Sequence, residues 1–106
     1  MRLPVDATLL LGEGADPALV EVWREERLPV ELIGAELEAL NTATVVICGE
    51  GGFEAAALAA RLGFRTFLVG DAAPEEVRAV SAVQAVEAAR GARARERWKA
   101  ARASGG

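Results

Sequence analysis

The sequence predicts a small α/β domain, a three-layer sandwich in which helices cover a mostly parallel sheet of about four strands. Three observations lead to this fold class. Short apolar runs end in glycine, which is typical of buried parallel strands. Segments with helical apolar spacing alternate with these runs, and that alternation favours a parallel sheet. Gly-Glu-Gly follows two of the runs and predicts two β-loop-α-β units, related by duplication or only by architecture.

The first unit fills the N-terminal half of the chain. Residues 8–11 form an apolar run that ends at Gly12-Glu13-Gly14, and they predict the first strand. Asp16 and Pro17 indicate a helix start, because Asp caps free N–H groups and Pro fits the first helical position. Pro29 ends this helix. The unit closes with a second strand and a short helix, expected at residues 30–33 and 35–40.

The second unit begins with the clearest strand pattern, residues 44–48, which ends at Gly49-Glu50-Gly51-Gly52. A helix is expected from about residue 53 to 62, with Gly63 well placed as its C-terminal cap. A fourth strand follows at residues 64–69 and ends at Gly70.

The last predicted element is a long helix. Pro74, Glu75 and Glu76 indicate its start, since proline and acidic residues favour a helix N-terminus. Its apolar side would consist of four valines, Val77, Val80, Val83 and Val86, and Gly91 marks a point of interruption.

Composition narrows the class of protein. The chain has 106 residues, which suits one domain, and one cysteine, Cys48, which excludes an internal disulfide and fits a cytoplasmic location. It lacks histidine, so the usual zinc sites and histidine-activated nucleophiles are excluded. No apolar run is long enough to span a membrane. Scarce Asn, Gln, Cys and Met suit a thermophile. A GC-rich genome is the alternative, since it would favour Arg and Ala over Lys.

The charges divide the chain in two. Residues 1–89, the predicted domain, carry six arginines against fifteen carboxylates, a net charge of −9. Residues 90–106, the basic tail, carry six cations against Glu96, a net charge of +5. The tail residues that can meet RNA phosphates are Arg90, Arg93, Arg95, Arg97 and Lys99. If the tail binds RNA, Trp98 would stack on a base. In the competing interpretation it packs on residues 1–89 or on a partner.

The loop Gly49-Glu50-Gly51-Gly52 is the candidate binding site, because glycines between a strand and a helix let backbone N–H groups face a ligand. Glu50 would repel a pyrophosphate and suits a ligand with hydroxyl or ammonium donors, such as a ribose. A plain tight turn is the alternative. Glu13 and Glu50 can share Mg²⁺ or stand as independent glutamates, and no metal is expected. Cys48 is interpreted as a buried structural thiol.

From Val45 onward the chain resembles the C-terminal domain of the RsmE-type family of SPOUT RNA methyltransferases. The match runs over residues 45–89 and consists of Val45-Val46-Ile47, Cys48-Gly49-Glu50-Gly51-Gly52-Phe53, Gly63-Phe64 and Val69-Gly70. Two features depart from the family. Cys48-Gly49 replaces Gly-Pro, and residues 73–79 differ from the segment that completes the family's knot and cofactor pocket. The family's N-terminal RNA-binding barrel is also absent from residues 1–44.

The resemblance implies a SPOUT-like fold, with a Rossmann-like fold as the alternative, and S-adenosylmethionine as ligand. The cofactor would contact Gly49, Glu50, Gly51, Gly52 and Gly70. Because of the departures we expect a degenerate, non-catalytic relative and assign no catalytic residue. An active RNA methyltransferase and an oligomeric interaction module without a small-molecule ligand are the alternatives. The family also implies a homodimer formed through the last, alanine-rich helix.

Overall fold

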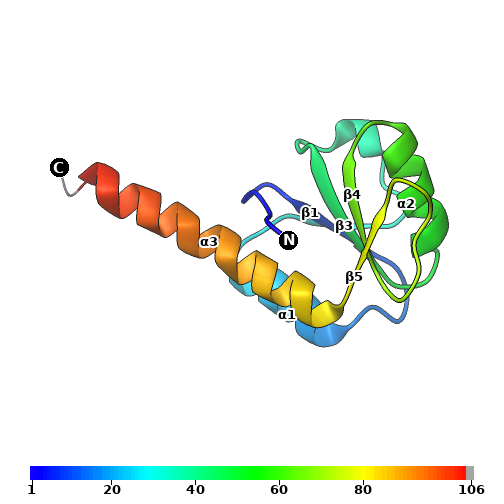
Figure 1. Ribbon diagram of the computed structural model, residues 1–106, viewed down its shortest axis with the longest axis horizontal. Coiled ribbons are helices and arrows are strands. Elements are labelled where there is room, and N and C mark those ends of the chain that lie inside the picture. The colour runs from blue at the N-terminus through cyan, green and yellow to red at the C-terminus, as the bar shows by residue number, and fades with distance from the viewer. Residues whose placement is uncertain (105–106) are drawn as a thin grey trace.

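A five-stranded parallel sheet forms the centre of the protein. The structure is a computed structural model and describes residues 1–104. Its strands are β1 (Thr8–Leu11), β2 (Val30–Leu32), β3 (Thr44–Cys48), β4 (Arg65–Val69) and β5 (Arg78–Val80). Their order is β2-β1-β3-β4-β5, and every neighbouring pair is parallel. The predicted α/β class is confirmed, with one strand more than expected (Figure 1).

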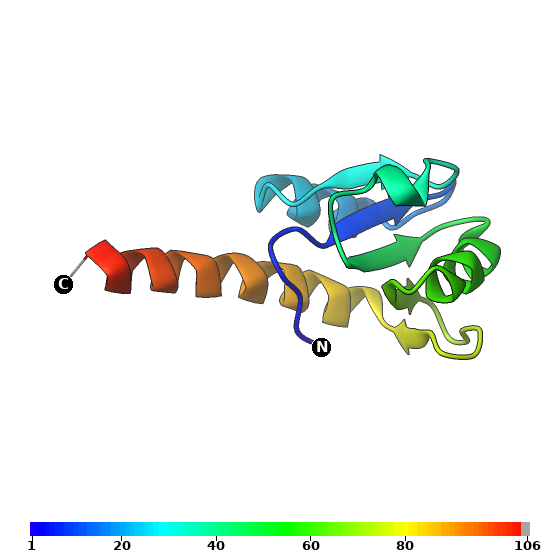
Figure 2. The ribbon, with the colours of Figure 1, turned by 90° about the horizontal axis from the view of Figure 1, so that it is seen from above.

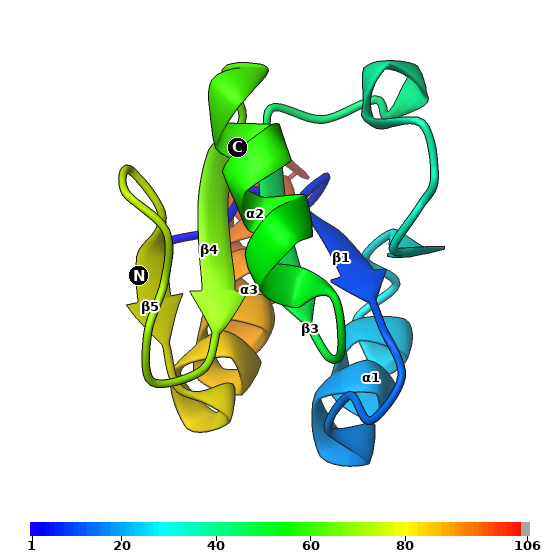
Figure 3. The ribbon, with the colours of Figure 1, turned by 90° about the vertical axis from the view of Figure 1, so that its right-hand side faces the viewer.

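Helices cover both faces of the sheet and complete the three layers. Helices α1 (Pro17–Glu25) and α3 (Ala82–Ser104) lie on one face. Helix α2 (Gly52–Arg61) and the 3₁₀ turn η1 (Leu37–Ala39) lie on the other (Figure 3). The predicted helix over 35–40 is therefore only one short turn; Glu36 precedes it without a side-chain cap, and Leu40 returns to extended backbone.

Two apolar clusters follow from the alternation of side chains along each strand. Leu9, Val46 and Phe67 face the cluster beneath α1 and α3. Leu10, Ile47 and Leu68 face the cluster beneath α2 and η1. The largest buried side chain is Trp23 of α1, whose Nε1–H donates to the carbonyl oxygen of Ala7 at 3.2 Å. Both faces of the central strands are buried, which explains their continuous apolar runs.

The predicted start of the last helix at Pro74 is wrong. Residues 78–80 form β5, and Glu76 has a φ of +69°, which no helix contains. Helix α3 begins at Ala82 instead, behind a reciprocal cap. The Ser81 N–H donates to Gln84 Oε1 at 2.8 Å, and the Gln84 N–H donates to Ser81 Oγ at 3.1 Å. This capping box satisfies N–H groups that a helix start leaves without partners.

The buried side of α3 also differs from the prediction. Of the four predicted valines, only Val86 packs on this side of α3, partly buried; the fully buried residues are alanines: Ala85, Ala88, Ala89 and Ala92. Val80 is buried in β5, whereas Val83 is 66% exposed. Gly91 does not interrupt the helix, which runs unbroken from Ala82 to Ser104 across the predicted boundary at residue 90. Its C-terminal half projects beyond the sheet (Figure 2).

The described residues contain no helix that combines the length and the apolar character needed to cross a bilayer. The longest helix, α3, carries most of the basic tail.

Candidate binding site at the carboxyl edge of the sheet

The strand order places both Gly-Glu-Gly loops at one point of the sheet. The carboxyl ends of parallel strands meet at the same edge, and β1 and β3 are neighbours there. From β1 the chain turns to α1 on one face, and from β3 it turns to α2 on the opposite face. Loops that diverge in this way leave a crevice at the strand ends, which is where open α/β sheets bind ligands.

The two loops are joined by backbone hydrogen bonds. The Gly12 N–H donates to the carbonyl oxygen of Cys48 at 2.8 Å, and the Glu50 N–H donates to that of Glu13, also at 2.8 Å. These bonds extend the β1–β3 pairing beyond the last strand residues, so the first loop is fixed against the second.

This close approach requires glycine at two positions. A Cβ at Gly12 would overlap the carbonyl oxygen of Glu50. A Cβ at Gly49 would lie 2.5 Å from the carbonyl oxygen of Gly12, and Gly49 has a φ of +105°. The repeated Gly-Glu-Gly motif therefore has a structural cause, because each loop supplies the glycine against which the other packs.

A pocket of about 570 Å³ opens at this junction. Its lining combines apolar side chains from the ends of β1 and β2 with the two Gly-Glu-Gly loops: Leu11, Gly12, Glu13, Leu32, Ile33, Glu50 and Gly51. Glu13 and Glu50 are exposed, and Leu32 is 69% exposed. The pocket thus offers two carboxylates beside an uncovered apolar surface.

The loops around this pocket carry negative charge only. The segments 12–16, 33–36 and 49–51 follow β1, β2 and β3 and contain no Lys or Arg. Their carboxylates are Glu13, Asp16, Glu36 and Glu50. Asp16 accepts a hydrogen bond from the Ala18 N–H at 2.9 Å, so a carboxylate already caps the N-terminus of α1. This edge favours cationic or hydroxyl-rich ligands over phosphates.

The structure brings part of the predicted cofactor set together. Glu50 and Gly51 line the pocket. Gly49 does not line it but lies against Gly12, which does. Gly52 is buried at the start of α2, where a Cβ would lie 3.0 Å from Leu68 Cδ1, so its role is packing. Gly70 follows β4 and donates its N–H to the Val80 carbonyl oxygen at 3.0 Å; it does not line the pocket.

Sequence reasoning missed the apolar side of this pocket. Leu32 and Ile33 end the second strand, and their signal was the apolar pair directly before Gly34. Glu13 joins Glu50 in the lining, so the first Gly-Glu-Gly loop belongs to the site as much as the second. Residues 73–79 do not line it; they form part of the β4–β5 loop and of β5.

Cys48 lies at the end of β3, only 5% exposed, within the cluster beneath α1 and α3. This position confirms the interpretation of a buried thiol. Within residues 1–104 no group of three or more Cys, Asp or Glu side chains is arranged to hold a metal ion.

The cations of the basic tail divide into two sets. Arg93 donates from Nε to the carbonyl oxygen of Glu26 at 2.9 Å and from Nη2 to that of Arg27 at 3.3 Å. Arg97 forms a 2.9 Å ion pair with the Glu26 carboxylate. These two arginines satisfy the C-terminal end of α1, where cations and donors are favourable. They anchor α3 to the C-terminal end of α1.

The other tail residues point elsewhere. Arg95 donates to the carbonyl oxygen of Leu3 at 2.8 Å, whereas Arg90 and Lys99 are exposed. Trp98 is 65% exposed, so most of its side chain is open to the predicted contact with a base or a partner.

Comparison of the chain with protein-family models, with curated proteins and with solved structures gave no match.

Proposed function

We propose that this protein binds a nucleoside-like small molecule, with S-adenosylmethionine as the first candidate, in the pocket between the two Gly-Glu-Gly loops. The observation that supports this proposal most strongly is the lining. Two exposed carboxylates, Glu13 and Glu50, share one pocket with the apolar side chains of Leu32 and Ile33. A nucleoside carries the matching groups, since its hydroxyls donate hydrogen bonds to carboxylates and its base covers apolar surface.

The charge of the pocket favours an uncharged or cationic nucleoside over a nucleotide. Phosphates next to Glu13 and Glu50 would meet like charge, and the surrounding loops supply no cation to offset it. The sulfonium and ammonium groups of S-adenosylmethionine are attracted instead. The resemblance to RsmE-type proteins at Glu50-Gly51-Gly52-Phe53 points to the same ligand.

We propose a binding role, with methyl transfer as the alternative activity. Gly70 and residues 73–79 correspond to parts of the cofactor pocket in the resembled family, and in this chain they lie outside the pocket lining. The proposed contacts accordingly come from the two loops and the end of β2.

Isothermal titration calorimetry tests the proposal. We expect S-adenosylmethionine to bind with a Kd of micromolar order, about −8 kcal/mol. Glu50→Gln should weaken binding about tenfold, because a hydrogen bond to a charged group contributes roughly 1.5–3 kcal/mol. The matched control is Glu54→Gln, which removes an exposed carboxylate of α2 outside the pocket lining and should leave the Kd unchanged.

A second titration, with S-adenosylhomocysteine, measures the contribution of the ligand's sulfonium charge. S-adenosylhomocysteine lacks the sulfonium charge and should bind about fivefold more weakly at low salt, given roughly 1 kcal/mol for a solvated charge pair at 4 Å. The difference should shrink as salt rises. The proposal would be refuted if neither ligand bound, or if Glu50→Gln and Glu54→Gln weakened binding equally.

Self-association, RNA binding and a cytoplasmic location stay predictions. One side of α3 is not covered by the sheet and exposes three apolar residues, Val83, Ala94 and Trp98. This surface suits a homodimer of the kind that the resemblance implies.

A further inference from the structure

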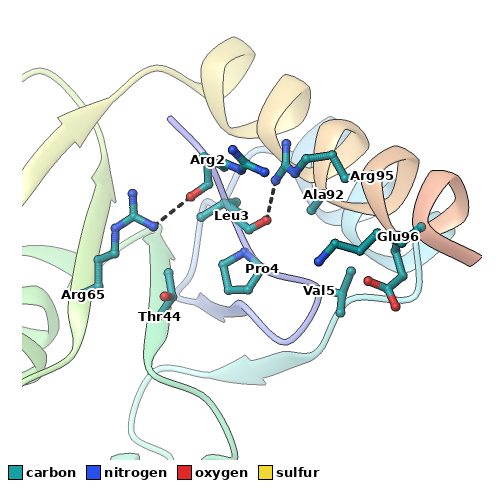
Figure 4. A pocket seen from close by; sticks show the side chains of 10 residues that line it. Arg2, Leu3, Pro4, Val5, Thr44, Arg65, Ala92, Arg95 and Glu96 are labelled. Atoms are coloured by element: carbon teal, nitrogen blue, oxygen red, sulfur yellow. Dashed lines mark hydrogen bonds between the residues drawn. The ribbon is translucent and has the colours of Figure 1, made fainter.

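A second pocket, of about 440 Å³, lies at the opposite edge of the sheet. Four segments that are distant in sequence meet there: the N-terminal residues, the first residue of β3, the first residue of β4 and part of α3 (Figure 4). Its polar lining consists of Arg2, Thr44, Arg65, Arg95, Glu96 and Lys99. Its apolar wall consists of Leu3, Pro4, Val5 and Ala92.

Four cations therefore gather around one small space against one carboxylate, that of Glu96. The only ion pair within residues 1–104 joins Arg97 to Glu26, so none of these four cations has a carboxylate within 4.0 Å among those residues. In Figure 4 the side chains of Arg2 and Arg95 point toward one another. Like charges held together in a hollow repel, and a bound anion would offset that repulsion.

Two of the guanidinium groups are held in place. Arg65 donates from Nη1 to the carbonyl oxygen of Arg2 at 2.8 Å and lies over the ring of Phe67, 4.9 Å from its centroid. Arg95 donates from Nη2 to the carbonyl oxygen of Leu3 at 2.8 Å. Figure 4 shows these arginines on opposite sides of the N-terminal segment. A guanidinium has five N–H donors, so one fixing bond leaves others to face a ligand.

Arg65 and Arg95 each bind one backbone carbonyl oxygen, but structural anchoring accounts most fully for Arg93 and Arg97. Those two residues meet acceptors at the end of α1. Lys99, by contrast, makes no hydrogen bond or ion pair with residues 1–104. It continues the face of α3 that is buried at Ala92, at the point where the helix leaves the sheet.

We infer that this pocket binds a phosphate group, carried by a small phosphate ester or by an RNA backbone. The fork of a guanidinium matches two phosphate oxygens at once, and Lys99 adds a mobile point charge. The volume lies in the range of small-molecule sites, roughly 300–1,000 Å³, and the apolar wall gives an organic group a surface to contact. The inference is independent of the nucleoside site at the carboxyl edge.

Calorimetry with inorganic pyrophosphate at low salt tests this inference. The wild-type protein should bind pyrophosphate, and Lys99→Gln should weaken binding about tenfold, the loss expected for a charge-assisted hydrogen bond. Lys99 forms no hydrogen bond or ion pair with residues 1–104, so its substitution should leave the melting temperature unchanged. Arg90→Gln is the matched control: it removes one exposed positive charge from the same helix, outside the pocket lining.

Lys99 also offers a direct readout, because it is the only lysine of the chain. Pyrophosphate should protect its ammonium group from acetylation, as measured by mass spectrometry of the peptide that contains it. Absence of pyrophosphate binding, or equal weakening by Lys99→Gln and Arg90→Gln, would overturn the phosphate site.

Competition with a short single-stranded RNA distinguishes the two phosphate sources. If RNA displaces pyrophosphate with a steep salt dependence, the backbone is the ligand. If pyrophosphate binds and RNA does not displace it, the ligand is a small ester. Both outcomes support the phosphate site. RNA that stays bound after Lys99→Gln and at saturating pyrophosphate binds elsewhere on the protein, and the ligand of this pocket is then the small ester.

Discussion

At the scale of single residues, Gly12 and Gly49 allow the two loops to meet. Each lies against the backbone of the other loop, and hydrogen bonds between the loops hold Glu13 and Glu50 at one pocket. The glycines could be predicted as turn residues, because they follow strands. Their backbone contact could not, although an Mg²⁺ shared by Glu13 and Glu50 would already require that the two strand ends are neighbours. Leu32 reaches the pocket because β2 pairs with β1, where Leu32 lies opposite Leu11.

We predict that Gly12→Ala lowers the free energy of unfolding by about 2–3 kcal/mol, because the added Cβ displaces the Glu50 backbone. Chemical denaturation measures the loss. The control is Gly14→Ala in the same loop, which has a φ of +74° and no atom within 4 Å of a Cβ. It should cost only the roughly 1–2 kcal/mol of a left-handed conformation. An equal or smaller loss for Gly12→Ala would contradict the proposed clash.

At the scale of elements, the two β-loop-α-β units could be predicted well and the chain after Gly70 could not. Val77, Val80, Val83 and Val86 recur every three residues, which fits a helix as well as a strand followed by one. The decisive signal was local: Ser81 and Gln84 have the spacing of a capping box, and they place the true start of α3. A strand as short as β5 is too brief for its alternation to be recognised.

Ser81→Ala should therefore lower the free energy of unfolding by about 1 kcal/mol, since it removes the side-chain oxygen that receives the Gln84 N–H. Thermal unfolding followed by circular dichroism measures the change. Val83→Ala is the control on the same helix turn; this side chain is 66% exposed, so its loss should change stability by no more than about 0.5 kcal/mol. Equal effects of the two changes would show that the cap contributes nothing.

At the scale of the whole molecule, the direction of α3 separates the charges. The helix begins beside the carboxyl end of β5 and runs back along the sheet, so its basic half reaches the amino edge (Figures 1 and 2). At the carboxyl edge, the loops 12–16, 33–36 and 49–51 contain carboxylates and no Lys or Arg, whereas residues 70–77 lead back to the amino end of β5. The sequence shows an acidic segment, residues 1–89, followed by a basic tail. The opposite charges of the two pockets depend on the path of α3.

The central claim is that the junction of the two Gly-Glu-Gly loops binds a nucleoside-like ligand, and amide chemical-shift mapping with S-adenosylmethionine tests it most directly. We predict saturable shifts confined to residues 11–14, 32–34 and 49–53, with the amides of residues 90–99 unchanged. Shifts at the amino edge alone, or no saturable shift at millimolar ligand, would contradict the claim.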